Sequence, residues 1–276
     1  MSSGKPEHDF FVVERISKSY GSNVILSDLS LCLEPGEFVC VLGRTGCGKS
    51  TLLKIMAGIE RPDAGRIIFR GKERAKKNTP LGQSRFGLVF QQDRLMDWRT
   101  VSGNVRFPLE IFGGKAGAGS KRDVAARVEE ALGIVGLGKF RNLYPHELSG
   151  GMRQRVAIAR SLVHDPEVLF LDQPFGAVDA ITKVALSGEL RGLWRRTRKT
   201  IVMVTNSVDE ALSVGSRIAV MDPSPAGIAG IFEVGEIPAG QPGKSDNAGP
   251  LAGLRREIRA RLENMPETGD GHRDAG

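Results

Sequence analysis

Short runs of consecutive apolar residues alternate along this chain with segments in which apolar residues recur every three or four positions. Runs of the first kind predict buried strands, and the spacing of the second kind predicts helices with one apolar face. The predicted strands are Phe10–Ile16, Val24–Leu33, Phe38–Leu42, Arg66–Phe69, Phe86–Phe90, Val168–Leu171, Ile201–Thr205 and Arg217–Met221. This alternation is typical of an α/β fold, in which helices cover a largely parallel sheet.

The N-terminal part of the pattern departs from that rule. The turn from Glu34 to Glu37 joins two predicted strands with too few residues for a helical crossover, which predicts an antiparallel β portion there. From Gln91 to Gly151 the pattern indicates helices and loops only, with a glycine-rich break at Gly113–Gly119, so we expect an α-helical subdomain at about 93–162 inserted in the α/β core. The predicted helices are Lys49–Ala57, Lys121–Val135, Met152–Val163 and Ala180–Thr197.

The C-terminal part has a different composition. Residues 235–250 are rich in glycine and proline and predict a linker after a main domain that spans 10–234. In 251–276, Leu251, Leu254, Ile258 and Leu262 fall on one helical face, which predicts an amphipathic helix followed by a tail. That helix could pack on the chain's own core or meet a partner.

Composition and charge narrow the class of protein. Of 276 residues, 40% are hydrophobic and 26% charged, which is ordinary for a globular protein, and no apolar run reaches the roughly 18 residues of a membrane-spanning helix. The first residues do not predict a secretory signal, and an odd number of cysteines, three, suits a reducing cytosol. The net charge of +7 leaves nucleic acid, an anionic membrane surface or a phosphorylated ligand as partners.

A phosphate-binding loop follows the predicted strand Phe38–Leu42. Its pattern is a glycine, four residues and Gly-Lys-Ser, and its residues are Gly43, Arg44, Thr45, Gly46, Cys47, Gly48, Lys49, Ser50 and Thr51. Glycines allow backbone N–H groups to turn around phosphate oxygens, while the lysine supplies a positive charge and the serine hydroxyl can ligate Mg²⁺. Asp172, at the end of another apolar strand, can hold the same ion. The alternative is a glycine turn that binds nothing.

The segment from Leu148 to Arg160 resembles the signature motif of ABC-type ATPases, and the resemblance covers roughly 10–234. The motif itself consists of Leu148, Ser149, Gly150, Gly151 and Met152. The resemblance implies a P-loop NTPase (RecA-like) core, ATP and Mg²⁺ as cofactors, and a head-to-tail dimer in which the signature faces the ATP held by the other subunit. A plain glycine-rich helix start is the alternative.

The same resemblance assigns roles to single residues. It implies that Tyr20 stacks on adenine, although a lone tyrosine is more often a core residue. It implies that Gln91 touches Mg²⁺, beside Ser50 and Asp172, and reports to the transporter, and that Asp179 lies at the dimer seam. The stretch from Gln91 to Val101, with Asn104, is most similar to importer ATPases of the nitrate, sulfonate, taurine and bicarbonate group.

Two positions depart from the family pattern. Gln173 stands where the family has a glutamate that polarises the attacking water, and Asn206 stands where it has a histidine that contacts the γ-phosphate. A neutral amide can orient water but cannot accept its proton. We therefore expect ATP binding with slow or absent hydrolysis at these catalytic positions. Both a natural degenerate site and an engineered trap would explain the two residues.

The resemblance implies an ATP-binding subunit of an ABC importer that drives a separate integral membrane permease, served indirectly by a solute-binding protein. It implies a cytoplasmic location, peripheral on the inner (plasma) membrane. Gln173 in place of the glutamate base, beside an intact signature, favours a heterodimer with a second ATPase subunit, with a homodimer possible. One alternative is an ATP-gated regulatory subunit that never hydrolyses. Another is a non-transport ABC protein of DNA or ribosomes, which the short spacing from Gln91 to Ser149 disfavours, so no nucleic-acid partner is expected.

Overall fold

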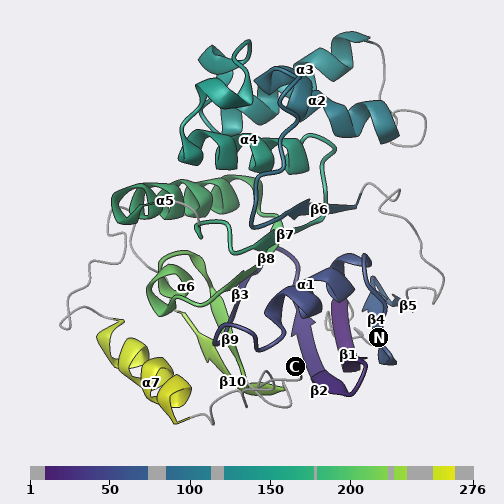
Figure 1. Cartoon of the computed structure of the whole chain (residues 1–276), viewed down its shortest axis with the longest axis vertical. Helices are drawn as coiled ribbons and strands as arrows, with labels where there is room; N and C mark the ends of the chain where they lie inside the picture. Colours follow the sequence, from purple (N-terminus) through teal and green to yellow (C-terminus); the bar gives the residue numbers. More distant parts are fainter. Residues whose placement is uncertain are drawn as a thin grey trace, which may run out of the picture. The chain divides into compact units, whose positions relative to one another are not determined.

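A computed structural model describes residues 10–73, 85–112, 121–176, 179–222, 227–234 and 251–264 (Figure 1). They form two compact units, the first from the described parts of 1–35, 39–78 and 204–276, the second from those of 36–38 and 79–203. The N-terminal segment, the glycine-rich break at Gly113–Gly119 and the 235–250 linker lie outside the described residues.

The first unit carries the predicted antiparallel β portion. Its elements are β1 (Phe11–Tyr20), β2 (Asn23–Leu33), β3 (Phe38–Leu42), α1 (Lys49–Ala57), β4 (Ala64–Phe69), β5 (Lys72–Glu73), α6 (Val208–Val214), β9 (Arg217–Met221), β10 (Ile228–Glu233) and α7 (Ala252–Glu263). Strands β2, β1, β4 and β5 form one antiparallel sheet in that order. Phe11 lies opposite Leu33 on one side and Phe69 on the other, and all three are buried.

A second group of strands in this unit positions the phosphate loop. Strand β3 pairs in parallel with β9, and β10 pairs antiparallel with β9. Every residue of β3 is buried, as its unbroken apolar run predicts for a strand covered on both faces. Sequence reasoning missed α6 and β10 because α6 is short and β10 is only half-buried, so neither shows a strong period.

The second unit combines strands with the predicted helical segment. Its elements are β6 (Phe86–Val89), α2 (Val101–Phe112), α3 (Lys121–Ile134), the 3₁₀ turns η2 (Gly138–Phe140) and η3 (Pro145–Glu147), α4 (Gly150–Leu162), β7 (Val168–Asp172), α5 (Ala180–Thr197) and most of β8 (Thr200–Thr205). Strand β6 pairs in parallel with β7, and β8 is next in order after β7.

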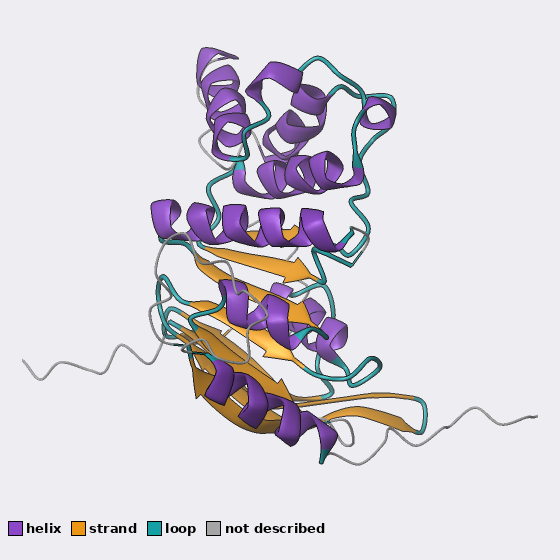
Figure 2. Ribbon diagram, turned by 90° about the vertical axis from the view of Figure 1, so that its left-hand side faces the viewer, coloured by secondary structure: helices purple, strands orange, loops and turns teal. Residues whose placement is uncertain are grey.

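Helices α2, α3 and α4 pack on one another in this unit (Figure 2). Between Gln91 and Gly151 the described residues form helices and 3₁₀ turns without a strand, as predicted. Helix α4 also approaches β6 closely, because a Cβ at Gly87 would lie 2.6 Å from the carbonyl oxygen of Ser161. The α/β class, the antiparallel β portion and the inserted helices are thus confirmed, while the domain boundaries stay predictions.

No helix in the described part of the chain is both long enough and apolar enough to cross a membrane. The three cysteines are free thiols, with Cys40 and Cys47 buried. Helix α7 packs on α6, and Ile258 on its predicted apolar face is fully buried. Within the first unit the helix therefore covers the chain's own core.

Candidate functional site

The phosphate loop connects β3 to α1 through residues that need a left-handed backbone. Gly46 has a φ of 85° and Gly48, the N-cap of α1, a φ of 93°. Residues with a side chain rarely adopt this region, so the glycines allow the loop to curl before the helix starts. The curl points the first N–H groups of α1 and the positive end of its dipole into the loop. The tip, Thr45 and Gly46, is exposed.

The loop also lies too close to its neighbours for side chains at two glycines. A Cβ at Gly48 would come within 2.9 Å of Ile25 on β2, and a Cβ at Gly43 within 2.6 Å of Cys47 Sγ. Burial raises the pKa of the Cys47 thiol, although Lys49 beside it opposes this. Cys47 is therefore a packing residue that holds the loop against β3.

Lys49 turns its ammonium group into the loop. Its Nζ donates hydrogen bonds to the carbonyl oxygens of Gly43 at 2.9 Å and Arg44 at 2.7 Å, and the side chain is only 4% exposed. A buried positive charge inside a ring of backbone groups is the environment that a phosphate anion requires. The loop thus fits the phosphate groups of a nucleotide.

Tyr20 lies beside this loop. Its hydroxyl donates a hydrogen bond to Glu60 and contacts the Thr51 side chain, and the Lys18 Nζ lies 5.4 Å from its ring centroid. Burial and the bond to Glu60 raise the pKa of Tyr20. The tyrosine is half exposed, so it is not a core residue, and it offers an aromatic face next to α1.

Asn206 follows the last residue of β8 and is exposed. The turn after it is fixed, because the Ser207 N–H donates to Thr205 Oγ1 and the Ser207 hydroxyl caps the N–H of Glu210 in α6. The position therefore presents a neutral amide at the carboxyl end of a strand.

In the second unit, β7 ends at Asp172, which is buried, and the chain turns sharply at Gln173. Gln173 has a φ of 43°, and its carbonyl accepts the N–H of Gly176 at 3.0 Å. A Cβ at Gly176 would lie 3.6 Å from Nε2 of Gln91, so the Gln91 amide packs over the same turn. Gln91 and Gln173, both singled out by the family resemblance, are brought together here.

Two arginines of α4 hold the segment after Gln91. Arg153 pairs with the Asp93 carboxylate at 3.0 Å and donates to the carbonyl of Leu148, in the signature. Arg160 donates to the backbone carbonyls of Asp93 and Arg94, both at 2.8 Å. Burial lowers the pKa of Arg160, with Asp93 opposing, but the guanidinium remains charged. The Gln91 segment and the signature are therefore one hydrogen-bonded assembly.

The signature begins α4. Ser149 is the N-cap, and its hydroxyl accepts the N–H of Met152 at 3.3 Å. Gly150 and Gly151 occupy the first turn, where backbone N–H groups lack intrahelical partners and can bind an anion. Ser149 is exposed, so this helix start can be reached by a second molecule.

Asp179 is the N-cap of α5. Its carboxylate accepts the backbone N–H groups of Ile181 at 3.1 Å and Thr182 at 3.0 Å, and the Thr182 hydroxyl at 2.6 Å. The hydrogen bonds from Thr182 lower the pKa of Asp179. The predicted seam residue therefore has a capping role within its own chain.

No group of three or more His, Cys, Asp and Glu residues in the described ranges is arranged to hold a metal ion. Ser50 in the first unit, and Asp172 and Gln91 in the second, have side-chain oxygens of the kind that Mg²⁺ prefers, and their assignment as its ligands stays a prediction. Ser50 and Asp172 each have a partner in this structure.

Sequence reasoning used Asn104 and the stretch containing Trp98 only for a family resemblance and did not predict their structural role. Asn104 is fully buried, and its amide exchanges hydrogen bonds with the backbone of Met96 and donates to Arg99 and Thr100. This shapes the loop in which Trp98 is 77% exposed. The burial of Asn104 has no periodic signal in the sequence, so its role in shaping this loop could not be predicted from the pattern.

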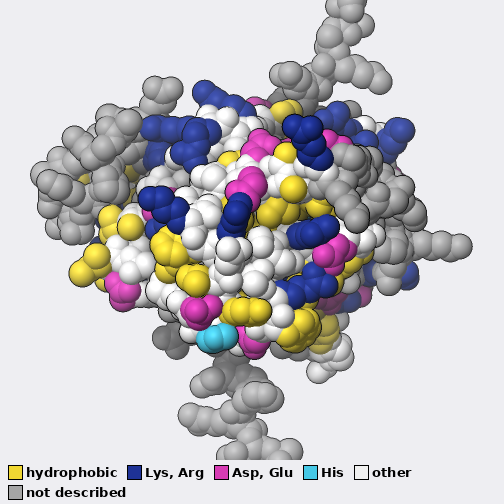
Figure 3. Space-filling model, turned by 90° about the horizontal axis from the view of Figure 1, so that it is seen from above, with side chains coloured by type: hydrophobic (Ala, Val, Ile, Leu, Met, Phe, Trp, Pro, Cys, Tyr) yellow, Lys and Arg dark blue, Asp and Glu magenta, His cyan; other side chains and the backbone are white. Residues whose placement is uncertain are grey.

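The basic charge forms no single stripe on the face seen in Figure 3, where Lys and Arg side chains are interspersed with acidic and apolar ones. Several arginines are paired with acids, as Arg15 is with Asp28 and Arg66 with Glu14. The overall charge of +7 is thus not gathered into a field on that face.

Comparisons with known proteins agree on one family. The family model described as ABC transporter matches residues 26–176. The bicarbonate transport ATP-binding protein CmpD of Synechococcus elongatus is 41% identical over 242 residues, which cover 86% of this chain and 84% of CmpD. The aliphatic sulfonates import protein SsuB of Bacillus cereus is 40% identical (80% and 83% covered), and the taurine import protein TauB of Ruegeria pomeroyi 42% (78% and 79%).

A solved structure is similar across most of the chain. It is the dimeric post-hydrolysis state of the ATP-binding cassette MJ0796 bound to ADP and phosphate, with a TM-score of 0.70 and 30% sequence identity. The match covers 83% of this chain and all of the other.

Proposed function

The chain belongs to the ABC transporter family, and we propose that it is the ATP-binding subunit of an importer whose own hydrolytic site turns over slowly or not at all. The phosphate loop carries the proposal, with Lys49 buried inside a glycine curl that opens a helix. The names of two relatives, the aliphatic sulfonates import protein SsuB and the taurine import protein TauB, support the importer class, and CmpD is named as a bicarbonate transport protein.

Each element would have a distinct part in binding ATP·Mg²⁺. Backbone N–H groups of 43–51 and the Lys49 ammonium would hold the phosphates, and Tyr20 would stack on the adenine. Ser50, Asp172 and Gln91 would hold Mg²⁺. The ion, when bound, neutralises charge on the phosphates during transfer.

The impaired hydrolysis rests on the chemistry of two amides. Gln173 directly follows Asp172, the aspartate proposed to hold Mg²⁺, and has a left-handed backbone conformation. Its amide can orient a water molecule but cannot take its proton. Asn206 can donate a hydrogen bond but carries no charge. General-base assistance is worth about 10²–10⁴-fold, or roughly 3–5 kcal/mol of barrier. Binding is retained in this proposal while the chemical step is slow.

Restoring the family's glutamate and histidine at positions 173 and 206 tests the proposal. We expect the variant with Gln173→Glu and Asn206→His to release phosphate from ATP at least about 10²-fold faster than the unmodified chain. Adding Lys49→Ala to that variant is the control and should abolish the gain by removing phosphate binding. Hydrolysis by the unmodified chain as fast as by the restored variant, with Gln173→Ala no slower, would overturn the impaired-site proposal.

A second ATPase subunit is part of the proposal, as a heterodimer by preference and a homodimer as the other possibility. The first turn of α5 exposes Ile181 (85%) and Val184 (53%) on one face, beside Asp179. Exposed apolar side chains at such a position suit a protein contact. Sedimentation of the purified chain with ATP and Mg²⁺ distinguishes the two, since a stable dimer without any partner favours the homodimer.

A membrane permease is the other proposed partner, which would make the chain peripheral on the cytoplasmic face of the membrane, with a solute-binding protein acting indirectly. The loop fixed by Asn104 presents Trp98 outward. The residues just before it are tied to the signature helix, because Arg153 pairs with the Asp93 carboxylate and Arg160 donates to the Asp93 carbonyl. We expect Trp98→Ala to reduce co-purification with the permease expressed beside it and to leave ATP binding intact. Ile111→Ala, at another exposed apolar position, is the matched control.

Gln173 and Asn206 also favour a second candidate, an ATP-gated regulatory subunit whose closure around nucleotide matters and whose hydrolysis never does. Single-turnover ATP assays with and without the partner ATPase separate the two. Phosphate formed from ATP held on this chain's own loop supports the importer ATPase, and none in either assembly supports the regulator.

A further inference from the structure

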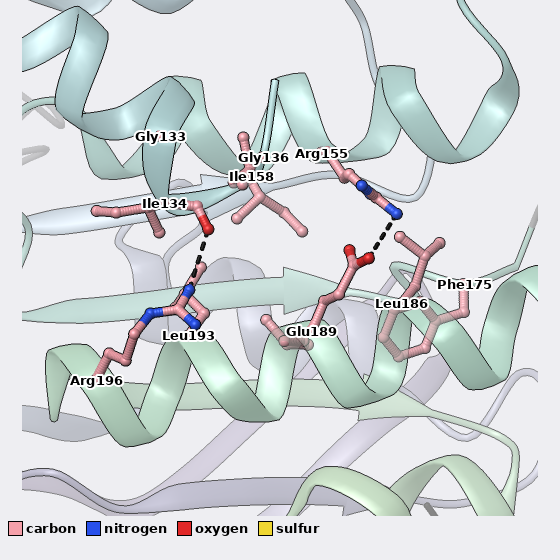
Figure 4. A pocket seen from close by; sticks show the side chains of 12 residues that line it. Gly133, Ile134, Gly136, Arg155, Ile158, Phe175, Leu186, Glu189, Leu193 and Arg196 are labelled. Atoms are coloured by element: carbon pink, nitrogen blue, oxygen red, sulfur yellow. Dashed lines mark hydrogen bonds and ion pairs between the residues drawn. The ribbon is translucent and has the colours of Figure 1, made fainter. Parts of the chain in front are cut away.

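A cavity of about 490 Å³, open to solvent on one side, lies in the second unit between the end of α3, α4 and α5 (Figure 4). Its walls are mainly apolar, and include Ile134, Ile158, Phe175, Leu186, Leu190 and Leu193. The volume falls in the range of sites that enclose small organic ligands. None of the residues assigned to ATP, Mg²⁺ or the signature lines it.

The charged residues of the cavity lie at two separate places along its wall. Figure 4 shows Arg196 at one end and the pair of Arg155 and Glu189 farther along, before Leu186 and Phe175. Arg155 Nη2 pairs with Glu189 Oε1 at 2.6 Å, so that position is close to neutral. Glu189 and Arg196 are seven residues apart on α5, or about 10 Å along the helix axis.

Arg196 gives the cavity its net positive charge. Its Nη2 donates to the backbone carbonyl of Ile134 at 3.1 Å, and no carboxylate among the described residues pairs with it. A guanidinium has five N–H donors and matches a carboxylate or sulfonate in shape and charge. An anionic group at this end would therefore find a fitting partner.

Arg155, away from Arg196, also has an unused donor. The Nε of Arg155 is buried and has no hydrogen-bond partner in the part of the chain that the structure describes. Buried N–H groups in native proteins are nearly always paired, so an oxygen supplied from within the cavity would satisfy it. Burial raises the pKa of Glu189, with Arg155 opposing, although about half of the Glu189 side chain (47%) remains accessible to solvent.

We propose that this cavity binds a small amphipathic organic anion, with the apolar body between α4 and α5 and the acidic group on Arg196. The charge balance of the lining, two guanidinium groups against one carboxylate, selects an anion over a neutral or cationic molecule of the same shape. The wall contains Phe175, in the turn that follows Gln173, and α4 and α5 begin at the signature and at Asp179. An occupant would thus touch the elements that carry the nucleotide chemistry.

Isothermal titration of the full chain with decanoate, without nucleotide, tests the proposal. We expect saturable binding of one decanoate per chain, with decanol and decyltrimethylammonium binding at least about tenfold more weakly, because they lose the charged hydrogen bond. Equal binding of all three, or no saturable binding of decanoate, would overturn it. The measurement needs no ATP, so its failure leaves the proposed ATPase function untouched.

Two pairs of variants locate the binding. Gly133 lines the cavity on α3 and Gly188 lies on α5 outside it, and a Cβ at either meets no atom within 4 Å. Gly133→Trp should block decanoate, while Gly188→Trp is the matched control and should bind normally. Arg196→Gln should weaken decanoate about tenfold, and Arg195→Gln on the same helix should not. Normal binding by Gly133→Trp would contradict the site.

Discussion

The first turn of α4 packs so closely on α5 that Gly151 has no room for a side chain. A Cβ at Gly151 would lie 3.0 Å from Thr182 Cγ2, whereas carbon atoms pack best at about 3.5–4.0 Å. The Thr182 methyl cannot rotate away freely, because its hydroxyl donates to the Asp179 carboxylate. Gly151→Ala must therefore move one helix start by roughly half an ångström.

Two opposing effects set the magnitude. Overpacking typically costs about 1–3 kcal/mol, and replacing glycine by alanine in a helix returns up to about 1 kcal/mol. We expect Gly151→Ala to lower the free energy of unfolding by about 1–2 kcal/mol in urea titrations followed by circular dichroism. Gly188→Ala, where a Cβ meets no atom within 4 Å, should instead be neutral or stabilising.

A double substitution makes the prediction sharper. Thr182→Ser removes the opposing methyl and keeps the hydroxyl that Asp179 binds, so combining it with Gly151→Ala should recover most of the lost stability. Equal effects of Gly151→Ala and Gly188→Ala, or no recovery in the double variant, would refute the close approach of α4 and α5.

Three further predictions concern other parts of the molecule. Tyr20→Ala should weaken ATP binding by about 5- to 100-fold in a fluorescent-nucleotide competition, whereas Tyr20→Phe keeps the stacking face and should bind normally. The pKa of Asp179 is lowered in the folded chain, so its ionised form stabilises the fold at pH values above the unfolded pKa of about 3.9. Urea titrations at several pH values should therefore show that the stability difference between the unmodified chain and Asp179→Asn disappears as the pH falls through the lowered pKa. Ile258→Ala in α7 should cost about 2–4 kcal/mol of unfolding free energy, while exposed Arg256→Ala stays within about 0.5 kcal/mol; equal effects would show that α7 does not dock.

The elements with the strongest local signal were predicted well. Lys49–Ala57 and Ala180–Thr197 have in the structure the bounds that the sequence predicts, because each has a clear start and stop signal and an apolar period. Strand β1 is longer than predicted and runs to Tyr20, since its pairing with β2 continues through irregular register that the apolar pattern does not show. Pairing partners far apart in sequence decide where such a strand ends.

For this protein, the amino-acid sequence by itself determined the α/β class, the phosphate loop, the signature and the two amides at Gln173 and Asn206, because these depend on residue type and spacing along the chain. Tertiary structure alone decided that Gln91 packs over the Gln173 turn, that Arg153 ties its segment to the signature, and that an apolar cavity with a charged end opens between α4 and α5. Those features join residues many positions apart, and only packing of the folded chain brings them within contact distance.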